Sequence, residues 1–110
     1  MPATHLIAYF FGGMFLTNAI PHWVSGLRGE PFQSPFAKPS GKGLSSSNVN
    51  ILWGFANLVF AYLLLERVGR FHLRTPHHAI AFGAGVLLMS LMSSHFFAPF
   101  HGGLHPAEKR

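Results

Sequence analysis

Apolar residues dominate three long stretches of this chain, and none of the three contains Asp, Glu, Lys or Arg. The uncharged stretches are Met1–Leu27, Gly43–Leu65 and Thr75–Ala107. A helix needs about 20 mostly apolar residues to cross the roughly 30 Å hydrocarbon core of a bilayer, and each stretch contains such a run. The pattern therefore predicts an all-α, polytopic membrane protein with three transmembrane helices.

We expect a single membrane domain, 1–110, whose elements follow the breaks in this pattern. The predicted helices cover about residues 6–24, 49–68 and 78–97, with a loop over 25–48 and a short C-terminal tail over 98–110. Pro21 is expected to kink or end the first helix, because proline lacks a backbone N–H and its ring clashes with the preceding turn. Oxygen-bearing side chains at 45–48 can cap the start of the second helix. Thr75 before Pro76 marks the start of the third.

The predicted loop is long and rich in Pro, Gly and Ser. Pro31-Phe32 and Pro35-Phe36 repeat one dipeptide within it, and the segment has neither a helical nor a strand period. Proline favours turn or extended geometry, while phenyl rings seek apolar cover. We expect a surface loop that lies on the membrane or folds back onto the helix ends. A functional lid or a partner-binding loop is the alternative, since loops of this length are often functional.

Composition supports the membrane interpretation over a soluble one. Only 10% of the residues are charged, against about 25% in a typical soluble domain. The mean hydropathy of +0.31 also allows a compact soluble bundle, but 110 residues cannot bury three helices that are apolar on nearly all sides. A cleaved signal peptide is an alternative for the first stretch, although no Lys or Arg precedes its apolar run. The chain has no cysteine, which excludes disulfides and thiol chemistry.

The basic residues predict contact with the lipid bilayer rather than with nucleic acid. The net charge is +5, and the basic side chains gather in short clusters at the ends of the predicted spans, where anionic lipid head groups lie. The side of the loop and C-terminus carries Arg28, Lys38, Lys42, Lys109 and Arg110, and the opposite side carries Arg67, Arg70 and Arg74. By the positive-inside rule, this distribution favours a cytoplasmic loop and C-terminus.

Small and polar residues recur at helical spacing in each predicted span. In the second span they are Ser47, Asn50, Gly54, Asn57 and Ala61, in the third Ala79, Gly83, Ser90 and Ser94, and in the first Ala8, Gly12 and Ala19. Small residues let membrane helices approach closely, and Asn or Ser can hydrogen-bond across the contact. We interpret these stripes as helix-packing surfaces. A solute path lined by Asn18, Asn57 and Ser90 is the alternative.

Histidine is the main candidate for cofactor chemistry, with eight copies in the chain. The first and third spans run parallel, so His22 and His95 fall at similar depth and could hold haem or another tetrapyrrole between them. Alternatively, His95, His101 and His105 could bind zinc or copper, with His22 as a fourth ligand. Neither set has a diagnostic spacing. Hydrogen bonding to water, backbone or lipid phosphate is the simpler interpretation of these histidines.

No catalytic constellation is visible, because the three acids, Glu30, Glu66 and Glu108, are isolated in the sequence. We therefore expect a protein without enzymatic activity. The favoured function is a structural or accessory subunit of a homo-oligomer or of a larger membrane complex, whose partners are other membrane subunits or copies of itself. The alternatives are a haem- or metal-binding redox subunit and a small-solute channel or transporter that works as an oligomer.

Overall fold

Three long helices make up most of the molecule. The structure is a computed structural model that describes residues 2–106. The helices are α1 (Ala3–Leu27), α2 (Ser47–Tyr62), which continues into a π-helical turn η1 (Leu63–Arg67), and α3 (Pro76–His101). With α2 and η1 taken together, each helix is long and apolar enough to cross a membrane. This confirms the prediction of a mainly helical chain with three such helices.

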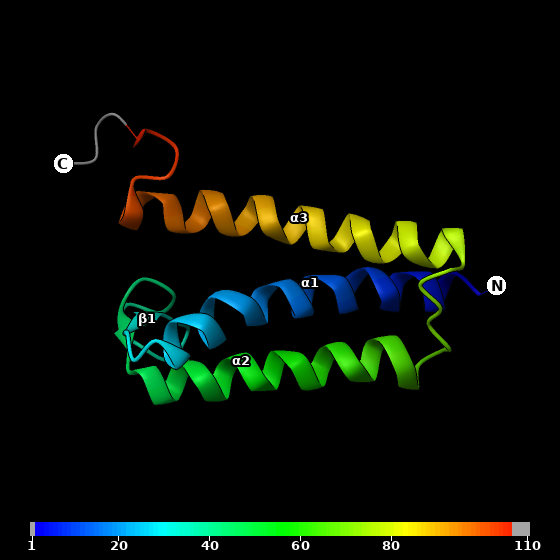
Figure 1. Cartoon of the computed structure of the whole chain (residues 1–110), viewed down its shortest axis with the longest axis horizontal. Coiled ribbons are helices and arrows are strands. Elements are labelled where there is room, and N and C mark those ends of the chain that lie inside the picture. The colour runs from blue at the N-terminus through cyan, green and yellow to red at the C-terminus, as the bar shows by residue number, and fades with distance from the viewer. Residues whose placement is uncertain (1, 107–110) are drawn as a thin grey trace.

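The central helix of the three is α1, which packs against both α2 and α3. Figure 1 shows α2 and α3 on opposite sides of α1, with the N-terminus at the end where α3 begins. Because α2 and α3 scarcely meet, α1 has more buried residues than either of them. Its buried residues are Ala8, Tyr9, Gly12, Gly13, Ala19, His22 and Gly26.

The first helix extends beyond its predicted bounds of 6–24 and contains Pro21 instead of ending there. Ala19 and Gly26, on either side of the proline, lie against α2. A Cβ at Gly26 would collide with Ile51 of α2, and a Cβ at Gly54 of α2 would lie 3.1 Å from the carbonyl oxygen of Ala19. This packing continues past Pro21 and favours helix there over the proline's local tendency to end one.

The starts of α2 and α3 follow their local sequence signals. The Ser46 side chain accepts a hydrogen bond of 3.2 Å from the backbone N–H of Val49, which caps α2. Pro76 occupies the first turn of α3 directly after Thr75.

The end of α3 lies beyond the predicted limit of residue 97. Pro99 is inside the last turn, and the helix ends at Gly102, whose φ of 75° is a left-handed conformation that glycine adopts without a steric cost. The first residues of the predicted tail therefore belong to α3. Residues 107–110 of that tail lie outside the described part of the chain.

The connection between α1 and α2 contains two short strands that the sequence did not predict. β1 (Phe32–Gln33) pairs antiparallel with β2 (Leu44–Ser45), with Phe32 opposite Ser45. Both Pro-Phe rings of this segment pack back onto helices: Phe32 lies 4.8 Å from Phe97 of α3, and Phe36 lies 5.2 Å from Trp53 of α2, between ring centroids. A two-residue strand is too short to show period-two alternation, so no sequence pattern could have revealed it.

Glycine allows the backbones of α1 and α3 to approach closely. A Cβ at Gly85 of α3 would collide with the carbonyl oxygen of Phe10, and a Cβ at Gly13 of α1 would collide with that of Phe82. Neither obstacle can rotate away, because both are backbone atoms. The crossing of α1 and α3 therefore requires glycine at these two positions.

Candidate functional site

A buried cluster of hydrogen-bonded polar groups joins α1 and α2 at the end of the molecule that carries the β-strands. The Nδ1 atom of His22 on α1 lies 2.7 Å from the Oδ1 atom of Asn50 on α2. His22 is 3% exposed and Asn50 is fully buried. The two residues are 28 positions apart in the sequence, so only the packing of α1 on α2 brings them together.

The hydrogen bonds of the Asn50 amide nitrogen determine that its amide oxygen faces His22. Its Nδ2 atom lies 3.1 to 3.2 Å from three backbone carbonyl oxygens, those of Phe32, Ser45 and Ser46. Carbonyl oxygens only accept hydrogen bonds, so the amide nitrogen of Asn50 must be the donor to them. Asn50 therefore ties together the start of α2 and both strands of the connection.

The contact with Asn50 sets the tautomer of His22. The Oδ1 atom of Asn50 can only accept, so Nδ1 of His22 carries the proton that it donates. In the neutral ring, Nε2 then has the lone pair. A histidine held in this way by a second polar group is the usual arrangement where the other ring nitrogen binds a ligand or metal.

Aromatic rings enclose His22 on several sides. The rings of Phe32, Trp53 and Phe97 lie edge-on to it, with centroids 5.3, 6.4 and 6.3 Å away. These rings come from β1, α2 and α3, so three other elements of the fold meet at this histidine of α1. This apolar enclosure strengthens the hydrogen bond between His22 and Asn50 and makes its loss costly.

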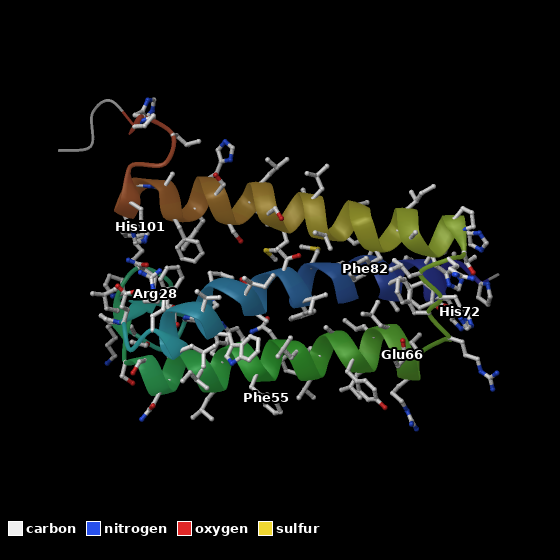
Figure 2. All side chains as sticks on the ribbon, viewed as in Figure 1. Arg28, Phe55, Glu66, His72, Phe82 and His101 are labelled. Atoms are coloured by element: carbon white, nitrogen blue, oxygen red, sulfur yellow. The ribbon has the colours of Figure 1, made fainter. Side chains whose placement is uncertain are left out.

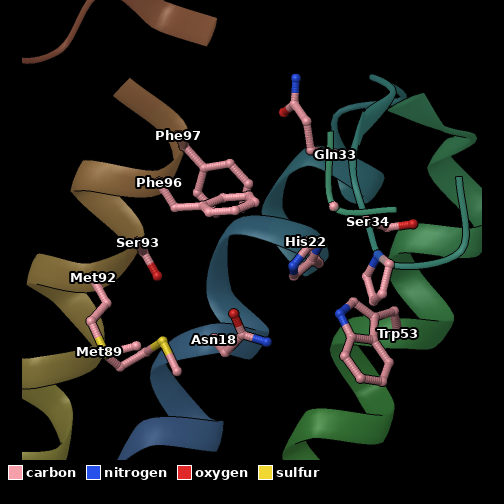
Figure 3. A pocket seen from close by; sticks show the side chains of 12 residues that line it. Asn18, His22, Gln33, Ser34, Trp53, Met89, Met92, Ser93, Phe96 and Phe97 are labelled. Atoms are coloured by element: carbon pink, nitrogen blue, oxygen red, sulfur yellow. The ribbon is translucent and has the colours of Figure 1, made fainter. Parts of the chain in front are cut away.

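A cavity of about 340 Å³ adjoins His22 between α1 and α3. In Figure 3, His22 lies between Trp53 and the side chains of α3. The apolar part of the wall includes Trp53, Met89, Met92, Phe96 and Phe97, and the polar part includes Asn18, His22, Gln33, Ser34 and Ser93. The Oε1 atom of Gln33 is buried and has no hydrogen-bond partner among residues 2–106. A mostly apolar wall with a few polar groups is typical of small-molecule sites.

A second polar contact between α1 and α2 lies deeper along the helices. Nδ2 of Asn18 donates to Oδ1 of Asn57 at 3.1 Å, and Nδ2 of Asn57 donates to the carbonyl of Trp53 at 2.8 Å. Ser90 lies apart from them, exposed on α3, and its hydroxyl donates to the carbonyl of Val86. The structure therefore does not bring Asn18, Asn57 and Ser90 together as a solute path within one chain.

The structure also separates the histidines predicted to share a cofactor. His95 is exposed on α3 and its Nδ1 lies 3.0 Å from the carbonyl of Leu91, whereas His22 is enclosed. His101 stacks on Phe32 with centroids 5.9 Å apart, and His105 is exposed. Across residues 2–106, no three His, Asp or Glu side chains are arranged to hold a metal ion. The helical turns between His95 and His101 place these two side chains in different directions, so the described chain does not bring His95, His101 and His105 together as a metal site.

The predicted packing stripe is mostly buried in α2 but mostly exposed in α3. In α2, Asn50, Gly54, Asn57 and Ala61 are buried and Ser47 is half-buried. In α3, Gly83, Ser90 and Ser94 are exposed and Ala79 is half-buried. The face of α3 that meets α1 instead contains His78, Phe82 and Gly85. Both Gly83 and Gly85 are small, so the sequence offered no basis for choosing between these faces.

Two residues of β1 were missed from the sequence: Gln33, which lines the cavity, and Phe32, whose ring packs against His22. Phe32 and Gln33 belong to the Pro-Phe segment, and that repeat is the one sequence signal that pointed to them. Comparisons with protein-family models, curated proteins and solved structures found no match to this chain.

Proposed function

We propose that this chain is an integral membrane protein that crosses the bilayer three times and acts as a non-enzymatic subunit. It associates with copies of itself or with another membrane subunit along the outer face of α3. The Lys and Arg distribution supports a cytoplasmic position for the α1–α2 connection and the C-terminus. The apolar surface supports lipid contact, since large side chains such as Leu52, Ile80 and Leu87 are more than 60% exposed.

The single observation that carries this proposal is the small share of α3 that the chain itself covers. Only 6% of the residues in the most apolar part of α3 are buried, against 28% for α1. A Cβ at Gly83 would meet no atom within 4 Å. Gly83, Ser90 and Ser94 thus form an open stripe of small residues on α3, which lets the backbone of another helix approach closely.

Replacing the stripe by large residues is expected to abolish assembly while each chain still folds. We expect the double variant Gly83→Leu and Ser90→Leu to run as a smaller species than the wild type in native electrophoresis of mild-detergent extracts. The physical reason is that leucine at these positions holds a partner helix away, whereas inside the chain it meets open space.

The matched control for this experiment is Ala84→Leu, which adds the same side chain to another exposed position of α3. One residue corresponds to about 100° around a helix, so this leucine lies well away from the stripe. A wild-type protein that is monomeric in native extracts would contradict the proposed association. Recovery of folded protein in the soluble fraction without detergent would contradict the membrane assignment.

A second candidate function, a cofactor-carrying subunit, is favoured by the geometry of His22. Its Nδ1–H donates a hydrogen bond to Asn50, and the ring lines the 340 Å³ cavity. An apolar cofactor such as a tetrapyrrole, held by one histidine, fits this arrangement better than the pairing of His22 with His95. In the described structure, His95 is exposed and bonded to its own helix.

For a bound tetrapyrrole, we expect protein purified from its native membranes to show visible absorption that His22→Ala removes. His95→Ala is the matched control and should leave the absorption unchanged, because that ring lies outside the cavity. A colourless wild-type preparation, or equal loss in both variants, would contradict this second candidate.

A further inference from the structure

The opposite end of the molecule contains a second and larger cavity, of about 810 Å³. It lies where α1 and α3 begin and η1 ends. Figure 2 shows Glu66 and His72 at this end, far from Arg28 and His101 at the other. The nitrogen-bearing side chains of its wall are those of His5, Arg67, Arg70, His72, His77 and His78. This concentration of hydrogen-bond donors is separate from the site around His22.

A buried hydroxyl in the wall of this cavity points to a ligand. Tyr9 is fully buried, and its hydroxyl has no hydrogen-bond partner among the described residues. Its ring is held by Phe71 and His78, with centroids 5.3 and 4.7 Å away. A Cβ at Gly69 would collide with the Tyr9 hydroxyl, so the turn after η1 accommodates that group only because residue 69 is glycine. An unsatisfied buried hydroxyl is costly, and a ligand oxygen in the cavity would satisfy it.

The charges around the cavity favour an anion. Arg67 and Arg70 line it and are exposed, and Glu66 is the one carboxylate in the described wall. The N-termini of α1 and α3 add to this preference, because both helices begin beside the cavity. Neither helix has a side-chain hydrogen bond at its N-cap, Pro2 and Thr75 respectively. The N-terminus of a helix carries partial positive charge and presents N–H donors to anions.

The backbone around His78 gives the cavity a defined shape. The N–H of His72 donates to Nδ1 of His78 at 3.0 Å, which joins the turn after η1 to the first turn of α3. In the neutral ring, the proton of His78 must then lie on Nε2. The cavity wall is thus held by contacts between α1, α3 and the turn between α2 and α3, rather than by exposed side chains alone.

We infer that this cavity binds a phosphate group, carried by an anionic phospholipid or by free inorganic phosphate. A tetrahedral phosphate offers several acceptor oxygens, which can accept from the Tyr9 hydroxyl and from the guanidinium groups together. The cavity lies at the ends of the apolar spans, where lipid phosphates are found. This inference goes beyond the proposed function and holds whether or not α3 has a partner helix.

The test uses the full-length chain in two kinds of lipid nanodisc. In the first, phosphatidylglycerol is diluted into phosphatidylcholine, and native mass spectrometry counts the phosphatidylglycerol that the released protein retains. In the second, the disc contains phosphatidylcholine alone, and inorganic phosphate is titrated while its ³¹P line width reports binding. Wild type is compared with Tyr9→Phe and with the double variant Arg67→Gln and Arg70→Gln.

We expect each variant to bind its phosphate about tenfold more weakly or worse, as for the loss of a hydrogen bond to a charged group. Tyr9→Phe keeps the ring that contacts Phe71 and His78, and circular dichroism verifies that its helices form. The control is Arg28→Gln, which removes one arginine charge at the other end of the molecule, where Arg28 pairs with Glu30. It should leave binding unchanged.

The two arms identify the source of the phosphate. Retention of phosphatidylglycerol that falls in both cavity variants supports a lipid ligand, and ³¹P broadening that falls in them supports free phosphate. Binding that is absent from both arms, or that is equal in wild type and cavity variants, would overturn the inference.

Discussion

Gly85→Ala is expected to destabilise the packing of α3 on α1 by about 3 kcal/mol, the upper part of the usual range for overpacking. The added Cβ would collide with the carbonyl oxygen of Phe10 and lie 3.3 Å from the backbone nitrogen of Met14. Both obstacles belong to the backbone of α1, so the helices must move apart to accept the methyl group. Their separation would remove contacts along the whole crossing, including those at Gly13.

Gly83→Ala is the matched control for this substitution. The two glycines lie two positions apart in α3, but a Cβ at Gly83 meets open space. Because alanine has the higher helix propensity by about 1 kcal/mol, we expect the control to be neutral or slightly stabilising. An equal loss of stability in both variants would contradict the close approach of α1 and α3 at Gly85.

The absence of native cysteine makes the separation of the helices directly measurable. Cysteines introduced at Phe11 of α1 and Leu88 of α3, which are 44% and 42% exposed, can carry spin labels without disturbing the contact. Electron–electron distance measurements should show a longer or broader distribution in Gly85→Ala than in Gly83→Ala. The free energy of unfolding is measured in parallel by adding sodium dodecyl sulfate to mixed micelles.

Asn50→Ala is expected to cost about 3 kcal/mol or more. Removing the amide leaves the His22 Nδ1–H without its acceptor and takes the Asn50 side-chain donor from the carbonyls of Phe32 and Ser45, whereas the Ser46 carbonyl still accepts from the backbone N–H of residue 50. Each buried polar group left unsatisfied costs about 1–3 kcal/mol. Water entry and local movement would make the total cost smaller than the sum of these separate costs. The same change should release the segment between α1 and α2, since Asn50 holds both of its strands.

The control for this second prediction is Asn48→Ala, two residues earlier in α2. Asn48 is exposed, so its substitution should alter stability by less than about 0.5 kcal/mol. Limited proteolysis of the 28–46 segment, together with thermal unfolding in detergent, measures both effects. Similar cleavage rates for the two variants would show that Asn50 does not organise this segment.

The three helices differ in how well the sequence predicted the face that each one buries. The stripe in α2 was visible because Asn50, Gly54, Asn57 and Ala61 are small or polar within an otherwise bulky segment, and these residues are buried against α1. In α3, small residues occur on more than one face. The choice between the faces of Gly83 and Gly85 depends on how closely α1 approaches, which no local pattern records.

The candidate site was predictable only in part. His22 was singled out as a boundary histidine, but its pairing with His95 rested on equal depth alone, and depth says nothing about direction around a helix. Asn50 was expected to pack, yet its hydrogen bond to His22 joins residues 28 positions apart. Gln33 and the cavity could not be foreseen, because they depend on the folding of β1 against the helices.

The sequence by itself determined the number and apolar character of the helices and the approximate segments that they occupy. Those properties are local, since the hydrogen bonds of a helix lie within its own segment and the surrounding medium acts on each segment separately. The tertiary structure alone decided which face of α3 meets α1, that α1 lies in the centre, and that His22 meets Asn50. These outcomes depend on backbone approach and side-chain fit between distant segments, and a helix that is apolar on nearly every side carries no signal of the face it will bury.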